Sequence, residues 1–201
     1  SAEIALSSMP EQLPAEGNIA ARWSQREGTV AFNPSTLRVP DISANFQGTL
    51  GQRMEVGILA SNLKSIEPYA GLFNGGKEFA LPVRLDKGQA SLEATVTGPI
   101  DDPVIEGTLT AQSALYEGVH LERMETQFTA TRSELILRGL QLAQNGARAT
   151  GNARGGLSEW KPAPSLPLQL QLTARGIDLK QLARLSNSTL DVAGKADAQL
   201  S

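Results

Sequence analysis

The stretch GPIDDPVIEGTLTA, residues 98–111, contains the two signals that decide the fold. Its first half is rich in turn formers, with two prolines, a glycine and the pair Asp101–Asp102. Its second half alternates strictly, with Ile105, Gly107, Leu109 and Ala111 on one side and Glu106, Thr108 and Thr110 on the other. Because successive side chains of a strand point to opposite faces, the stretch predicts a turn followed by a strand with one apolar and one polar face.

The same alternation recurs along the chain. The apolar sides of the further segments are Met54, Val56 and Ile58; Leu92, Ala94 and Val96; Ala147, Ala149, Gly151 and Ala153; Leu166, Leu168, Leu170, Leu172 and Ala174; and Leu190, Val192, Ala196, Ala198 and Leu200. Glycine, asparagine and proline separate these segments at intervals of roughly 8–12 residues, which is typical of short strands in an all-β array. One apolar and one polar face per strand indicates an antiparallel sheet.

Two segments leave this pattern and predict short amphipathic helices. Leu63 and Ile66 stand three apart within residues 62–73, and Leu179, Leu182 and Leu185 do so within residues 178–188 after a possible N-cap at Asp178. Each follows one alternating segment and precedes another, which indicates an internal repeat. We therefore expect a linker or partial strand over 1–17, a first β-repeat over 18–112 with a helix near 62–73, and a second β-repeat over 113–201. The second repeat has a helix near 178–186 and is truncated at its C-terminus.

Composition narrows the class of protein. Hydrophobic residues make up 40% of the 201 residues but aromatic residues only 4%, so leucine, alanine and valine must fill a thin or a long and shallow core. The net charge of −3 gives no indication of nucleic-acid binding, and the lack of cysteine excludes disulfides and thiolate metal sites.

No apolar run reaches the roughly 18 residues of a membrane-spanning helix. The N-terminus lacks the features of a signal peptide, and both ends read as cuts, so we expect a piece of a longer protein.

No arrangement of residues predicts an enzyme, a cofactor or a metal site. The single histidine, His120, reads as a surface residue near a hairpin rather than a catalytic or metal-binding one. Asp101–Asp102 lacks the third spaced acid of a calcium loop, and Gly75-Gly76-Lys77 lacks the spacing of a phosphate-binding loop. No serine stands in a GxSxG elbow.

The segments taken together resemble a known protein family. The pattern of residues resembles the repeat region of the TamB/AsmA-like family, long proteins of the Gram-negative envelope, over most of the chain from about Gly28. The matching residues are Gly98, Pro103, Ile105, Gly107, Leu109, Tyr116, Gly118, Leu135, Leu137, Leu140, Leu142, Gly151, Ile177, Asp178, Leu179 and Leu182. The family's N-terminal membrane helix has no counterpart among these residues. The resemblance implies an elongated antiparallel β-trough, the β-taco groove, that is extended by repeats as in a solenoid.

Periodicity alone leaves three ways to cover the apolar face: a second sheet, a closed barrel, or a trough that folds along its length. Leucine, isoleucine, valine and alanine can line a cavity without filling it, and the family resemblance implies the trough, so we expect a trough lined by apolar side chains. The predicted lining residues are Met54, Val56, Ile58, Leu92, Val96, Ile105, Leu109, Leu168, Leu170, Leu172, Val192 and Leu200.

The resemblance implies a periplasmic segment of an inner-membrane-anchored parent that conducts phospholipid acyl chains between the inner and outer membranes in support of outer-membrane biogenesis. An outer-membrane Omp85-type barrel would then be a partner of the parent protein. One alternative is a chaperone-like translocation and assembly module that offers strand edges to outer-membrane and secreted β-proteins. Another is a structural β-solenoid spacer with a filled core.

Overall fold

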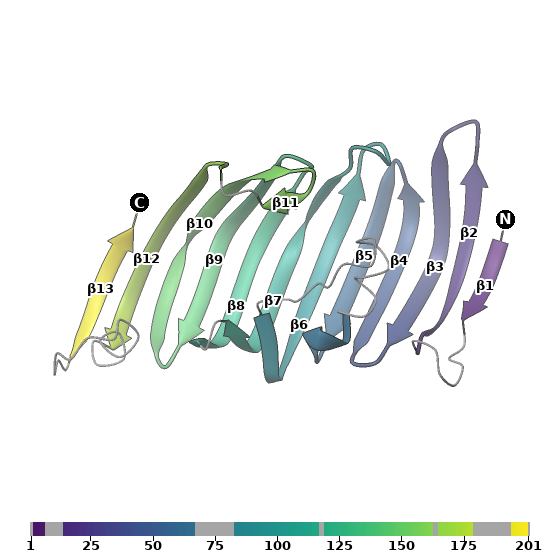
Figure 1. Ribbon diagram of the computed structural model, residues 1–201. Helices are drawn as coiled ribbons and strands as arrows, with labels where there is room; N and C mark the ends of the chain where they lie inside the picture. The colour runs from purple at the N-terminus through teal and green to yellow at the C-terminus, as the bar shows by residue number, and fades with distance from the viewer. Residues whose placement is uncertain are drawn as a thin grey trace.

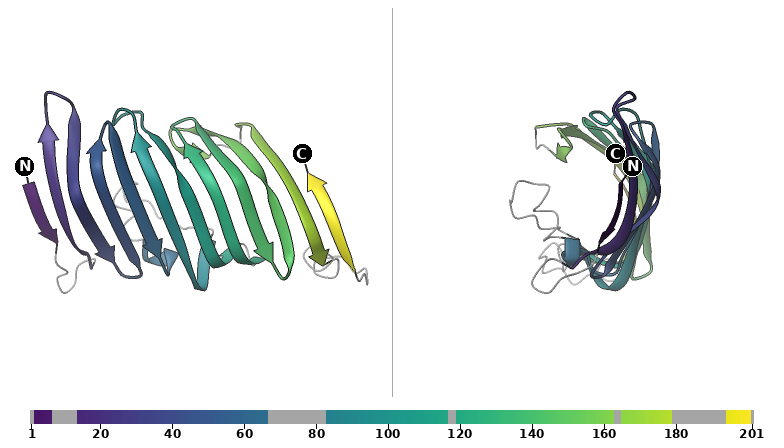
Figure 2. Two further views of the ribbon diagram at one scale, coloured as in Figure 1. Left: turned by 180° about the vertical axis from the view of Figure 1, so that it is seen from behind. Right: turned by 90° about the vertical axis from the view of Figure 1, so that its right-hand side faces the viewer.

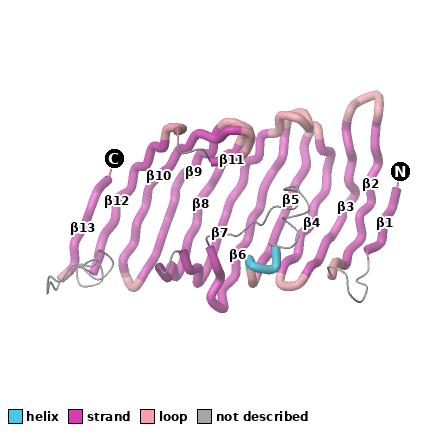
Figure 3. The backbone as a smooth tube through the Cα atoms, in the orientation of Figure 1, coloured by secondary structure: helices cyan, strands magenta, loops and turns pink. Residues whose placement is uncertain are grey.

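The computed structural model describes residues 2–6, 14–66, 83–116, 119–162, 165–178 and 194–200. In these residues it contains thirteen strands and one 3₁₀ helix, drawn in Figures 1 and 3. The strands are β1 (Ala2–Leu6), β2 (Glu16–Ser24), β3 (Thr29–Val39), β4 (Ile42–Leu50), β5 (Arg53–Ala60), β6 (Val83–Thr97), β7 (Val104–Tyr116), β8 (Val119–Ala130), β9 (Glu134–Gln144), β10 (Ala147–Ser158), β11 (Lys161–Pro162), β12 (Leu168–Asp178) and β13 (Lys195–Leu200); the helix is η1 (Leu63–Ile66).

All strands belong to one antiparallel sheet whose order follows the chain. The order runs from β1 to β10 and continues through β12 to β13, while the short β11 pairs with β10 off this path. Within the described residues β1 and β13 each pair on one side only, so the sheet is open (Figure 1). The prediction of an all-β antiparallel fold is therefore confirmed.

The strand register places the apolar sides of successive strands on a single face. Met54 pairs with Val96 and Val96 with Ile105, and four residues along the same strands Ile58 pairs with Leu92 and Leu92 with Leu109. Directly opposed residues of neighbouring strands point to the same side of a sheet. The alternation predicted strand by strand is therefore in phase across β5, β6 and β7.

The strands bow along their length, and the apolar face lies on the inside of the bow. In the end-on view of Figure 2, η1 and β11 lie on the concave side. Leu63 of η1 packs against the buried cluster of Ala90, Ala111 and Ala114. Ala90 and Ala111 pair with each other in the register that carries Leu92 and Leu109, so they belong to the apolar face.

Buried hydroxyl groups hydrogen-bond the backbone at two irregularities in the strand pairing. The β8–β9 register shifts between Glu125 and Gln127, next to Gly139, which adopts a positive φ of 59°. Thr126, only 2% exposed, places its hydroxyl 3.0 Å from the carbonyl oxygen of Gln127 and 3.2 Å from that of Arg138. The extra residue of a bulge leaves backbone groups without ladder partners, and this hydroxyl serves one of them.

Ser35 performs the same task at the β2–β3 irregularity. The register of this pair shifts between Asn18 and Ala21, and Ser35 is also only 2% exposed. Its hydroxyl donates to the carbonyl of Asn33 at 2.8 Å and accepts from the amide of Ala20 at 3.2 Å. Thr126 and Ser35 thus lie among apolar side chains because their hydroxyls hydrogen-bond backbone groups at the irregularities.

We expect Thr126→Val to lower the free energy of unfolding by about 1–2 kcal/mol, because valine keeps the shape but leaves a buried carbonyl without its donor. Urea denaturation followed by circular dichroism measures this change. Thr126→Ser keeps the hydroxyl and removes only a methyl group, so it is the matched control and should retain more of the stability than valine. A valine variant as stable as wild type would show that the hydroxyl contributes nothing.

Only part of the predicted helices falls within the described residues. The helix predicted near 62–73 is a single 3₁₀ turn in its described part, Leu63–Ile66, and residues 67–73 lie outside the described residues. Residues 179–186 of the second predicted helix also lie outside them. The predicted repeat boundary between residues 112 and 113 falls within β7.

Candidate functional site

The apolar face of β4 to β13 is the candidate site, and we define it by the following residues. They are Ile42, Ala44 and Phe46; Met54, Val56, Ile58 and Ala60; Ala90, Leu92, Ala94 and Val96; Ile105, Gly107, Leu109 and Ala111; Met124, Thr126, Phe128 and Ala130; Leu135, Leu137, Leu140 and Leu142; Ala149, Gly151, Ala153 and Gly155; Leu168, Leu170, Leu172 and Ala174; and Ala196, Ala198 and Leu200. Residues of this face that pair in register form rows that run across the strands.

The structure brings the predicted lining residues together on this face, with one exception. Met54, Val56, Ile58, Leu92, Val96, Ile105, Leu109, Leu168, Leu170, Leu172 and Leu200 all belong to it. Val192 lies outside the described residues.

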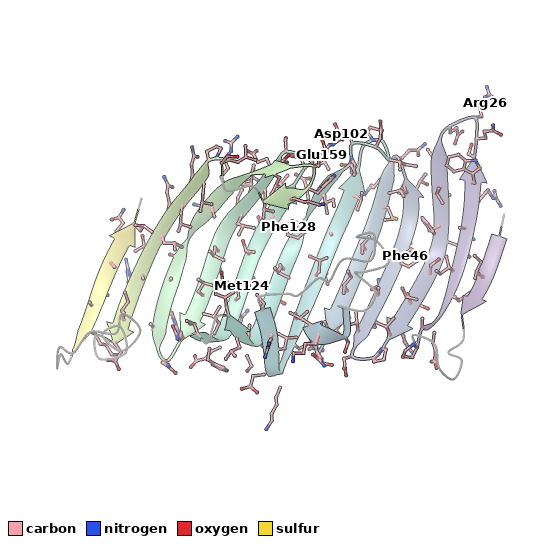
Figure 4. The ribbon with its side chains drawn as sticks, viewed as in Figure 1. Arg26, Phe46, Asp102, Met124, Phe128 and Glu159 are labelled. Carbon is pink, nitrogen blue, oxygen red and sulfur yellow. The ribbon has the colours of Figure 1, made fainter. Side chains whose placement is uncertain are left out.

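Several members of the apolar face were not predicted. Phe46 and Phe128 lie over the sheet on β4 and β8, with Met124 nearer the lower turns (Figure 4). Phe46 also makes an edge-to-face contact with Phe32, their ring centroids 5.2 Å apart. The alternation of Ile42, Ala44 and Phe46 would have revealed β4. In β9 the bulge at Gly139 shifts the phase between Leu137 and Leu140, which hides the alternation from a strict period of two.

Most of the apolar face is only partly covered. Of its residues only Ala60, Ala90, Ala111, Leu140 and the hydroxyl-bearing Thr126 are buried. Leu168 is 74% exposed and Leu200 56% exposed, whereas the other leucines of the face, apart from the buried Leu140, are half-buried. Among the described elements, extensive contacts occur only between paired strands and from η1 to β4 and β6. Within the described part of the chain, no second layer packs over this face.

Two hollows lie over β9, β10 and β12. A pocket of about 190 Å³ lies at the lower end of these strands, and its lining includes Leu142, Ala149 and Ala174 of the apolar face together with Arg148 and Asp178. A shallower depression of about 800 Å³ lies higher on the same strands. Its lining includes Leu168 and Leu170 but also Arg138 and Arg154, whose side chains belong to the opposite face.

Asp41 holds η1 against the lower end of the apolar face. It lies in the turn between β3 and β4 with a positive φ of 64°, and its carboxylate accepts hydrogen bonds from Ser65 at 2.9 Å and Asn62 at 3.3 Å. Its backbone carbonyl accepts the amide of Ser61 at 2.8 Å, and the side chain of Asn62 accepts the amide of Lys64 at 3.1 Å. These bonds position Leu63 on the alanine cluster.

We expect Asp41→Gly to release η1, because glycine adopts the positive φ freely but removes both carboxylate bonds. Hydrogen exchange at the amides of Lys64 and Ser65 should accelerate by about tenfold, the equivalent of roughly 1.4 kcal/mol of local stability. Asp41→Asn is the matched control, because its amide oxygen still accepts hydrogen bonds and should keep exchange near wild type. Unchanged exchange in the glycine variant would contradict this role for Asp41.

The opposite, convex face is polar and carries the charged network. Gln47 hydrogen-bonds Glu55 at 3.1 Å, Arg123 pairs with Glu125 at 2.9 Å, and Arg154 pairs with Glu134. Charged groups also gather at the turns, where Figure 4 shows Arg26, Asp102 and Glu159. The hydrogen bond from Arg132 to Glu159, followed by the negative charge of Glu159, raises the pKa of the Arg132 guanidinium.

The residues considered as candidates for a catalytic or metal-binding site lie apart from one another. His120 is half-buried on β8 and pairs in register with Leu115 of β7. Asp101 and Asp102 lie exposed in the turn before β7, where the amide of Asp102 donates to the carbonyl of Pro99 at 3.2 Å. Within the described ranges, no three histidine or acidic side chains converge as they would around a metal ion. None of the helical segments described is long and apolar enough to cross a bilayer.

Comparison with known proteins adds no relative: no family model matches the chain, and neither a curated protein nor a solved structure matches it.

Proposed function

We propose that the apolar face is a non-enzymatic binding surface for the acyl chains of phospholipids, which it shields from water. The observation that carries this proposal is the continuous, half-exposed apolar face that runs from β4 to β13 on the concave side of the sheet. Stable single sheets normally bury such a face against another element. Large exposed apolar patches on proteins mark sites of interaction with ligands, partners or membranes.

The dimensions and chemistry of the face suit a hydrocarbon chain. The strands from β4 to β13 make eight spacings of about 4.8 Å, which gives a path of roughly 40 Å across the strands. Each methylene group that leaves water contributes about 0.8 kcal/mol. The rows offer leucine, phenylalanine and alanine without an ionised side chain, so no charge has to be desolvated when a chain binds.

In this proposal the chain is a periplasmic segment of a TamB/AsmA-like protein whose trough conducts phospholipid between the inner and outer membranes. The parent protein is anchored in the inner membrane and meets an outer-membrane barrel of the Omp85 type. The family resemblance of the sequence supports this placement, together with the single antiparallel sheet in chain order. The mechanism is passive: the apolar face holds acyl chains while the polar face remains in water.

Lipid extraction of the purified protein followed by mass spectrometry tests the proposal. We expect phospholipids to copurify with the protein and to be displaced by a fluorescent fatty acid in proportion to its concentration. A protein that carries no lipid and binds no fluorescent fatty acid would refute acyl-chain binding.

A second candidate is the chaperone-like module that pairs with extended client segments. Its support is that β1 and β13 each pair on one side only within the described residues, and that Ile4 and Leu200 on these strands are about half exposed. Unpaired strand edges accept added strands. Binding of extended β-strand peptides by a protein free of lipid would favour this candidate over the lipid conduit.

A further inference from the structure

The convex face of the C-terminal strands carries an arginine patch without matching acidic partners. We define the patch as Arg138, Arg148 and Arg175. Arg148 of β10 pairs in register with Arg175 of β12, so two like charges stand directly opposite each other on neighbouring strands. Arg138 lies on the same face of β9, where it pairs with Gln127. All three side chains are exposed.

The protein itself does not neutralise this patch. Across the described residues, none of the three arginines forms an ion pair, whereas the neighbouring Arg154 is paired with Glu134. Asp197, on the adjacent β13, accepts the amide of Gly176 at 3.0 Å rather than a guanidinium. Arg138 makes only a hydrogen bond to the hydroxyl of Thr129, at 3.2 Å. Like charges directly opposite each other in a sheet are destabilising. Because Arg148 and Arg175 have no acidic partner, binding of an external anion would relieve their repulsion.

Neutral polar side chains lie between the arginines. Asn152 pairs with Gln171 and Thr150 with Thr173, both between the Arg148–Arg175 pair and Arg154. Side-chain amides and hydroxyls both donate and accept hydrogen bonds, as the peptide backbone does, whereas a phosphate group only accepts. The patch therefore matches a polypeptide better than a lipid headgroup.

The shape of the face and its charge select the kind of polypeptide. Because the strands bow outward here, a flat bilayer or a second copy of this face would touch the patch only along a line (Figure 2). An extended segment matches this line of contact, because it can lie across β10 and β12 along the row that Arg148 and Arg175 share. The neighbouring part of the same face carries Glu93 and Glu106, on β6 and β7, which repel an acidic chain and restrict it to the C-terminal strands.

We propose that the arginine patch binds an extended acidic segment of a partner protein. The guanidinium groups pair with carboxylates, and the amides and hydroxyls between them hydrogen-bond the backbone of the segment. This surface is on the face opposite to the apolar site, so the two can be occupied together.

Fluorescence anisotropy with labelled poly-L-glutamate tests the proposal. The wild-type protein should bind at low ionic strength, and the affinity should fall as salt screens the charges. The double variant Arg148→Gln/Arg175→Gln should bind about tenfold more weakly. Arg53→Gln is the matched control, because Arg53 is an exposed arginine on the same face of β5, and it should leave binding within about twofold.

Thermal unfolding provides an independent readout. Removal of the opposed charges should raise the Tm of the double variant by about 1–2 °C while binding is lost. A fall in Tm, or equal loss of binding in Arg53→Gln, would overturn the proposal. So would arginine-dependent binding to phosphatidylglycerol vesicles without binding to poly-L-glutamate, or arginine-dependent self-association in sedimentation.

Discussion

Leu170→Asp is expected to weaken binding of a fluorescent fatty acid by at least tenfold. Leu170 lies on β12 within the apolar face, where it pairs with Ala153 of β10. The change removes a leucine contact worth about 1.5–3 kcal/mol when fully buried and places a carboxylate in the path of the acyl chain. Since 1.4 kcal/mol corresponds to a factor of ten, this contact alone accounts for the predicted loss.

The neighbouring residue provides the matched control for this experiment. Gln171 follows Leu170 on the same strand, points to the convex face and is exposed, so Gln171→Asp introduces the same charge on the other side of the sheet. It should bind the fatty acid within about twofold of wild type, because it touches no apolar row. Both variants should keep the strand content measured by circular dichroism. Equal binding by the two variants would contradict an acyl site on the apolar face.

Gly151→Ala is expected to lower the free energy of unfolding by about 2–3 kcal/mol, because a Cβ at this position would overlap the backbone carbonyl oxygen of Gln171 on β12. The two strands can relieve the overlap only by moving apart, which weakens their hydrogen bonds. For a chain of this size the Tm should fall by roughly 4–12 °C, as measured by differential scanning calorimetry.

Gly155→Ala on the same strand and the same face is the matched control. Its Cβ would lie 3.7 Å from Cδ1 of Leu168, an ordinary van der Waals contact. Because alanine also reduces the freedom of the unfolded chain, this change should leave stability unaltered or raise it by about 0.4–1 kcal/mol. Equal destabilisation by the two alanines would show that the close approach of β12 to Gly151 is not what requires glycine there.

The glycines within alternating segments show which features follow from the sequence and which only from the structure. Gly107 and Gly151 stand within alternating segments, where glycine often marks a bend or a bulge of the strand. Gly151 does lie at a register shift between β9 and β10, whereas Gly107 lies in a regular stretch of the β6–β7 pairing. At both positions a neighbouring carbonyl occupies the place of a Cβ. Only the approach of another strand, distant along the chain, creates this requirement.

Some lining residues could likewise be assigned from the sequence, whereas others could be assigned only from the structure. Met54, Val56 and Ile58 could be assigned to one face from their spacing alone, since a period of two is a local property of a strand. Leu140 and Leu142 could not be joined to Leu137 in this way, because the bulge at Gly139 changes the phase. The role of Thr126 on an apolar face was likewise invisible, since its partner carbonyl at Arg138 lies on the next strand.

The sequence by itself determined an all-β antiparallel chain, its two-faced strands and the membership of most of the apolar face. These properties depend on side-chain alternation and turn residues, which act over a few neighbouring positions. The tertiary structure decided that the strands pair in chain order in one open sheet, that the apolar face lies inside the bow, and that Arg148 faces Arg175. These depend on register between strands, which backbone pairing, bulges and close glycine contacts set across the sheet.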